Sequence, residues 1–70
     1  MEKELLSLVS DFLNIENCNL ETKRSDIENW DSLAHVMLLS EIENKFDKKI
    51  KIEDFASVTS VKDILDLLQK

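Results

Sequence analysis

Residues 30–46, WDSLAHVMLLSEIENKF, decide the fold, because a polar start leads there into a long run rich in apolar residues. Asp31 is a good helix N-cap: its carboxylate accepts a first-turn N–H, and its charge suits the positive end of the helix dipole. At about 100° per residue, one side of the run forms an apolar stripe that we assign to the core: Leu38, Leu39, Ile42 and Phe46. The stretch therefore predicts a helix from Asp31 to Phe46.

A second apolar arc lies on the same predicted helix, beside Ser32. It consists of Leu33, Val36 and Met37 and runs towards Ser40 and Glu41. A helix that only covers a core does not need this second patch, and exposed apolar clusters often mark contact surfaces. We therefore expect one face of this helix to be buried and another to be available to partners.

Further amphipathic segments lie on both sides of it. The segment from Glu2 to about Asn14 gathers six apolar residues on one broad face: Leu5, Leu6, Leu8, Val9, Phe12 and Leu13. Residues 53–57 are predicted to form one helical turn, with Ile52 and Phe55 packing inward. Residues 60–63 have the form of a capping box that opens a helix from Val61 to about Gln69. The segment from Ile15 to Asp31 has no sustained period and predicts a loop that its apolar residues pin to the core: Ile15, Leu20, Ile27 and Trp30.

The composition favours helices. Gly and Pro are absent and 43% of the 70 residues are hydrophobic, which argues against hairpins and against disorder. Amphipathic helices this short bury their stripes only against each other. The sequence therefore predicts one all-α domain over residues 1–70, a small antiparallel four-helix bundle.

Charge and residue usage exclude several functions. A net charge of −6 argues against nucleic acid as a partner, and the longest apolar run, Val36–Leu39, is too short to span a membrane. With one Cys and one His the chain offers no intramolecular disulfide and no Cys/His zinc set, and we expect no Ser-His-Asp triad. The acidic residues near Asp47 and Glu53 lack the spacing of a calcium loop. We expect no metal site, no catalytic residues, a cytoplasmic location and a monomer.

The pair Asp31-Ser32 allows two interpretations. Asp or Ser at a helix start is a common capping device. A serine at this position is also a favourable place for an added phosphate, because free N–H groups and the helix dipole stabilise negative charge there. The residues alone leave both interpretations open.

The stretch Trp30–Leu65, WDSLAHVMLLSEIENKFDKKIKIEDFASVTSVKDIL, resembles the acyl carrier protein family. The resemblance rests on Asp-Ser-Leu at the start of the helix, the Leu38–Ile42–Phe46 stripe, and the Val58–Val61 entry into the last helix. It implies a four-helix carrier in which Ser32, next to Asp31, bears 4′-phosphopantetheine, donated from coenzyme A by a phosphopantetheinyl transferase. The thiol of this arm holds acyl groups as thioesters for loading and transferring enzymes, so the carrier itself is no enzyme.

The resemblance also implies a docking surface on this helix: Asp31, Leu33, Val36, Met37, Ser40 and Glu41. Carriers of general fatty-acid synthesis have more acid there, whereas the Trp30-Asp31-Ser32 form is similar to dedicated, stand-alone carriers of secondary pathways. The resemblance thus implies partner enzymes of fatty-acid, polyketide or other specialised biosynthesis. An acyl pocket lined by Leu39, Ile42, Ile50, Phe55 and Val58 is one interpretation, although the same residues serve equally as core. Two alternatives stay open: an aminoacyl or peptidyl carrier, and a helical interaction module without a prosthetic group.

Three single residues fit structural roles. His35 falls on the core side of the helix and is expected to be packed or hydrogen-bonded at its rim and not to act as a base. Trp30 is expected to anchor the preceding loop. Cys18 is expected to be a half-buried small apolar residue.

Overall fold

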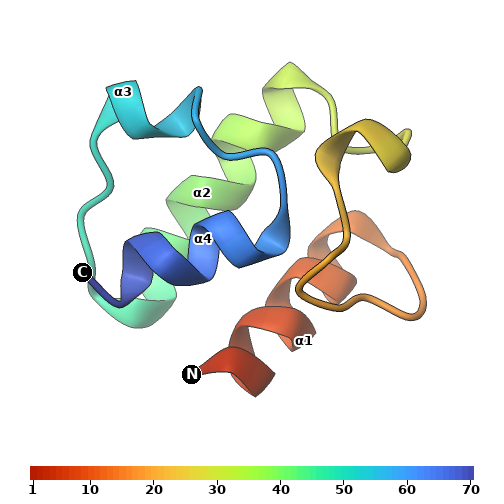
Figure 1. Cartoon of the computed structure of the whole chain (residues 1–70), viewed down its shortest axis with the longest axis horizontal. Helices are drawn as coiled ribbons and strands as arrows, with labels where there is room; N and C mark the ends of the chain where they lie inside the picture. Colours follow the sequence, from red (N-terminus) through yellow and green to blue (C-terminus); the bar gives the residue numbers. More distant parts are fainter.

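The computed structural model describes residues 1–70 and contains helices and no strands, which confirms the predicted all-α class (Figure 1). Its elements are α1 (Glu2–Leu13), the 3-10 helix η1 (Arg24–Asp26), α2 (Ser32–Phe46), α3 (Ile52–Phe55) and α4 (Val61–Leu68). The four predicted helices are present, with ends that differ from the prediction by one or two residues. The short helix η1 was not predicted, because no periodic pattern marks so few residues.

Two of the long helices end in left-handed residues without any glycine. Asn14 follows α1 with φ 55° and ψ 51°, and Asp47 follows α2 with φ 51° and ψ 49°. Asn and Asp tolerate this conformation better than other residues with a Cβ, because their short polar side chains bond locally. The chain thus stops its helices sharply despite the absence of glycine.

The apolar faces meet in one core. Helix α1 packs on α2 and α4, and α3 packs on α2. The predicted stripe on α2 is confirmed, since Leu38, Leu39 and Ile42 are fully buried and Phe46 packs at the edge. No helix is long and apolar enough to cross a membrane. The core contains 13 buried residues: Leu5, Val9, Leu13, Trp30, Leu38, Leu39, Ile42, Ile50, Val58, Val61, Ile64, Leu65 and Leu68.

The loop between α1 and α2 is fastened to the start of α4. The Arg24 N–H donates to the Thr59 carbonyl at 2.9 Å, and the Val61 N–H donates to the Thr22 carbonyl at 3.1 Å. Lys23 and Ser60 form an isolated antiparallel bridge in the same place. The prediction of a pinned loop is confirmed: Trp30 is buried, and Ile15, Leu20 and Ile27 pack against the core. This attachment fixes the path of the chain as it approaches α2 (Figure 1).

The predicted cap of α4 is present in a modified form. The Ser60 hydroxyl accepts the Asp63 N–H at 3.4 Å, as a capping box requires. The Asp63 carboxylate accepts the Thr59 N–H and hydroxyl, both at 2.8 Å. These hydrogen bonds from Thr59 hold the pKa of Asp63 below its ordinary value. The cap therefore also ties α4 to the connection that precedes it.

The expected inward packing of Ile52 is wrong, since 85% of its surface is exposed. Side chains of an α-helix lean towards its N-terminus and cover the preceding turn. Ile52 is the first residue of α3 and has no preceding turn, so its side chain projects past the helix end into solvent. Phe55, at the other end of the same turn, packs against the core as predicted.

Candidate functional site

Ser32 is the first residue of α2 and its side chain is exposed. Asp31 precedes it as the N-cap: its Oδ1 accepts the Ala34 N–H at 2.9 Å and its carbonyl accepts the His35 N–H at 2.8 Å. The prediction of Asp31 as a cap is confirmed. Because Asp31 fills the capping role, the Ser32 hydroxyl is left free for another purpose.

The start of α2 suits a negatively charged group. The N–H groups of Ser32 and Leu33 donate no hydrogen bond within the chain, since the cap satisfies only the amides that follow. Free N–H groups and the helix dipole favour a phosphate at such a place. An exposed hydroxyl beside free donors fits a phosphate ester on Ser32.

Arg24 lies beside Ser32, a feature that the sequence analysis missed. Its Nη2 donates to Ser32 Oγ at 3.4 Å and its Nε donates to the Trp30 carbonyl at 3.3 Å. The one ion pair of the structure joins the amino terminus to Glu4, so the Arg24 guanidinium pairs with no carboxylate. Arg24 is the only arginine of a chain with net charge −6, and this is the one feature of the sequence that sets Arg24 apart.

Two buried side chains, Trp30 and His35, form a hydrogen-bonded pair behind the site. Trp30 Nε1 donates to His35 Nδ1 at 2.9 Å, and His35 Nε2 lies 2.7 Å from the Phe55 carbonyl. These partners assign the neutral tautomer with its proton on Nε2, because Nδ1 must accept and the carbonyl needs a donor. His35 is only 4% exposed and both ring nitrogens are engaged. The predictions of a packed His35 and an anchoring Trp30 are confirmed, and His35 is not placed to act as a base for Ser32.

The predicted docking residues follow Ser32 along the outer side of α2. Leu33, Val36 and Met37 are 70%, 49% and 51% exposed, and we name these three the α2 surface patch. Ser40 and Glu41 are also exposed. The exposure of the patch is unusual for large apolar side chains and fits a contact surface. The docking role itself stays a prediction.

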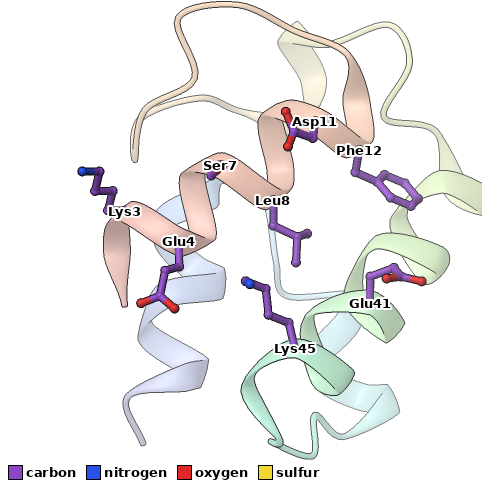
Figure 2. A pocket seen from close by; sticks show the side chains of 8 residues that line it. All are labelled: Lys3, Glu4, Ser7, Leu8, Asp11, Phe12, Glu41 and Lys45. Atoms are coloured by element: carbon purple, nitrogen blue, oxygen red, sulfur yellow. The ribbon is translucent and has the colours of Figure 1, made fainter.

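Glu41 stands apart from the patch, because it borders a surface hollow between α1 and α2 of about 630 Å³ (Figure 2). Leu8 and Phe12 of α1 form the apolar part of this hollow, and Lys45 of α2 stands one turn beyond Glu41. The other lining residues are Lys3, Glu4, Ser7 and Asp11. Because positive and negative side chains line the hollow together, its charge favours neither an anionic nor a cationic ligand.

The residues of the predicted acyl pocket belong to the core. Leu39, Ile42, Ile50 and Val58 are buried, and Phe55 is half-buried. The surface hollows touch Ile50 and Val58 separately and do not include Leu39, Ile42 or Phe55. Whether these side chains part to admit an acyl chain stays a prediction.

The remaining polar side chains form no metal site. No group of three or more His, Cys, Asp or Glu side chains is placed to hold a metal ion. Cys18 is half-buried as predicted, and burial raises the pKa of its thiol while a hydrogen bond with Thr22 opposes that rise. At Ser32, by contrast, an exposed hydroxyl lies beside free helix N–H groups and an unpaired guanidinium.

A comparison with protein families gives a match to the family described as "Phosphopantetheine attachment site" over residues 3–68. No curated protein matches the chain. The match spans nearly all of the 70 residues and includes Ser32 with the whole of α2. Members of this family carry 4′-phosphopantetheine covalently on a serine and do not catalyse a reaction themselves. The chain belongs to the phosphopantetheine-dependent carrier proteins.

Proposed function

We propose that Ser32 carries the 4′-phosphopantetheine and that the protein is an acyl carrier. The observation that supports this most directly is the exposed Ser32 hydroxyl at the start of α2, next to a cap that does not use it. Of the six other serines, Ser10 donates its hydroxyl to Ile15, Ser57 donates to Asp54 and Ser60 caps α4. The remaining three are exposed, but none of them is the first residue of an α-helix: Ser7, Ser25 and Ser40. Ser32 combines exposure, free helix amides and a nearby cation.

Attachment requires a separate transferase. Ser32 Oγ forms a bond to the phosphorus of the phosphopantetheinyl group of coenzyme A, adenosine 3′,5′-bisphosphate leaves, and the hydroxyl proton passes to a base. His35 is buried with both nitrogens engaged, so the transferase must supply that base. When bound, the arm supplies the thiol that holds the cargo as a thioester.

The residues of the chain hold and present the arm. Asp31 keeps α2 capped, so that its first turn stays formed at the attachment point. The buried Trp30 fixes the residue before the cap. The α2 surface patch offers apolar contact area, and within α2 only Glu41 and Glu43 are acidic. Docking by loading enzymes therefore depends more on apolar contact than on charge steering.

The proposal also covers the oligomeric state, the cellular location and the pathway of the protein. Residues 1–70 act as one monomeric carrier domain in the cytoplasm, where a single unpaired cysteine such as Cys18 remains reduced. The small number of acids on α2 favours a dedicated pathway of fatty-acid, polyketide or other specialised biosynthesis. An aminoacyl or peptidyl cargo is the competing assignment, and a separate measurement decides between the two.

The attachment is tested with the full chain, coenzyme A and a broad-specificity phosphopantetheinyl transferase, followed by intact mass measurement. We expect the wild-type chain to gain the mass of one phosphopantetheinyl group and Ser32→Ala to gain none. Ser40→Ala is the matched control, because Ser40 is an exposed serine of the same helix and should not affect the gain. An unmodified wild-type chain would indicate an interaction module without a prosthetic group.

The cargo is tested on protein isolated from its own cells. The arm is released from the protein in the mass spectrometer and its mass compared with that of the free arm. A fatty or polyketide acyl increment supports the acyl carrier, whereas an amino-acid increment would replace it with an aminoacyl carrier.

A further inference from the structure

The guanidinium of Arg24 is the positive group closest to the Ser32 hydroxyl. The Nη2–Oγ distance is 3.4 Å, which is long for a hydrogen bond and worth little when the acceptor is a neutral hydroxyl. On its other side, Arg24 Nε donates to the Trp30 carbonyl at 3.3 Å. The guanidinium is thus aimed at Ser32 while its contact with the unmodified side chain is weak.

The backbone of Arg24 is held in place by the fold. Its N–H donates to the Thr59 carbonyl at 2.9 Å, and it begins the short helix η1. Trp30, whose carbonyl receives the Nε–H, is only 2% exposed and is itself fixed by His35. A side chain held at both ends loses little entropy when it binds a ligand, which makes it a pre-organised donor.

The charge of Arg24 is uncompensated. The chain holds 15 acidic residues, yet no carboxylate pairs with the guanidinium of Arg24. Guanidinium groups bind phosphate oxygens through two parallel N–H bonds, and such charge-assisted bonds are about twice as strong as neutral ones. A phosphodiester on Ser32 would place that negative charge at the atom which Arg24 already faces.

The guanidinium also stands at an open surface. Arg24 forms part of a hollow of about 510 Å³ between η1 and the connection from α3 to α4. Trp30 and Val58 form its apolar floor, and Lys23 stands beside Arg24 on its rim. Because the Arg24 Nη2–Ser32 Oγ contact is itself exposed, a group attached to Ser32 reaches Arg24 without displacing any part of the core.

We propose that Arg24 binds the phosphodiester of the arm on Ser32, an inference that rests on the proposed function. The guanidinium takes phosphate oxygens from the η1 side, and the free N–H groups of Ser32 and Leu33 face the phosphate from the α2 side. Arg24 thereby fixes the first atoms of the arm and couples the loop before α2 to the prosthetic group. It is a binding residue and takes no part in the attachment chemistry.

The test compares the full chain before and after attachment of the arm by NMR. Because Arg24 is the only arginine, its Nε–H signal is unique in the spectrum. We expect this signal to shift on attachment and its exchange with water to slow. Ser32→Ala, treated in the same way, should show neither change. This measurement needs no variant of Arg24 and is independent of how well such variants fold.

A second measurement uses the phosphorus resonance of the attached arm. Arg24→Gln should move this resonance towards its position in free phosphopantetheinyl esters, and Arg24→Lys should fall between the two. Lys23→Gln is the matched control, because it removes the same charge from the same hollow and should leave the resonance unchanged.

The outcomes separate the two proposals. If the wild-type chain accepts the arm but the Nε–H signal and the phosphorus resonance of Arg24→Gln both stay unchanged, the role of Arg24 is refuted and the carrier function stands. If the wild-type chain gains no phosphopantetheinyl mass, both proposals fail together.

Discussion

Trp30 donates its indole N–H to Nδ1 of His35 across 2.9 Å, in the core directly beneath the proposed attachment point. The other ring nitrogen of His35, Nε2, lies 2.7 Å from the carbonyl of Phe55 at the end of α3 and hydrogen-bonds to it. One buried imidazole thus joins the residue before the cap, the long helix α2 and the single turn of α3. No buried side-chain nitrogen or oxygen of the structure lacks a hydrogen-bond partner, those of Trp30 and His35 included.

Replacing His35 by Leu should destabilise the protein while preserving its volume approximately. The buried indole N–H of Trp30 would lose its acceptor, which costs about 1–3 kcal/mol for an unsatisfied group. Urea unfolding followed by circular dichroism measures the change in free energy of unfolding. Trp30→Phe and the double variant complete a mutant cycle, and we expect a coupling energy of about 0.5–3 kcal/mol. A coupling energy near zero would contradict the assigned hydrogen bond.

Asp63 should make the stability of the protein depend on acid. Hydrogen bonds from Thr59 lower the pKa of Asp63 in the folded protein below its ordinary value of 3.8. A carboxyl whose pKa is lower in the folded state than in the unfolded state stabilises the fold at every pH above its unfolded pKa. This contribution is lost as the pH falls through the folded pKa. Asp63→Asn should therefore unfold more easily at pH 7 and show a shallower loss of stability between about pH 5 and pH 2.

Asp66→Asn is the matched control for this measurement, because Asp66 lies in the same helix with an exposed side chain. It should leave the acid dependence of the unfolding free energy close to that of the wild type. An Asp63→Asn variant with the wild-type acid slope would show that Thr59 does not act through this carboxylate.

Met37→Glu should separate folding from docking. Met37 is 51% exposed, so the free energy of unfolding should change by no more than about 0.5 kcal/mol. The rate of attachment by the phosphopantetheinyl transferase should fall, because a charge interrupts the apolar contact of the α2 surface patch. Leu38→Glu, at the neighbouring fully buried position, should unfold the chain. Unfolding of Met37→Glu would overturn the division of α2 into two faces.

Cys18 should react slowly with alkylating reagents. Burial raises the pKa of its thiol, so less of the nucleophilic thiolate is present at neutral pH. Iodoacetamide should therefore modify the arm thiol of the loaded protein first and Cys18 more slowly, and unfolding in urea should speed the reaction of Cys18. Intact mass measurement over time counts the adducts, and Cys18→Ala identifies the slow one. Equal rates at both thiols would contradict the burial of Cys18.

Asp47→Gly should stabilise the protein. Asp47 ends α2 with φ 51°, a conformation that costs most residues with a Cβ about 1–2 kcal/mol, Asp less, and a glycine almost nothing. Its negative charge also stands at the negative end of the helix dipole. Glycine also gives the unfolded chain more conformational entropy, which offsets part of the stabilisation. We therefore expect the free energy of unfolding to rise by about 1 kcal/mol in total. Asp47→Asn, which removes only the charge, should give the smaller part of this gain.

Local patterns determined most of the fold. The Leu38–Ile42 stripe, the cap at Asp31 and the opening of α4 at Ser60 were all predictable, because helix periodicity and capping act over a few residues of the chain. The exposure of Leu33 and Met37 followed from the same periodicity. The predicted burial of Ile52 was wrong because it was based on the apolar residue type alone. The direction of the side chain depends on its place at the start of α3.

The sequence alone thus specified three long helices, the apolar face that each buries, and the position of Asp31-Ser32 at the start of α2. That the cap at Asp31 leaves the Ser32 hydroxyl unused was established by the structure. Only the tertiary structure brought Arg24 to that serine and enclosed His35 between Trp30 and Phe55. Both arrangements depend on the path of the loop before α2, which is fixed by backbone hydrogen bonds to Thr59 and its neighbours. Such bonds join main-chain groups that every residue carries, so no residue pattern in the sequence records where they form.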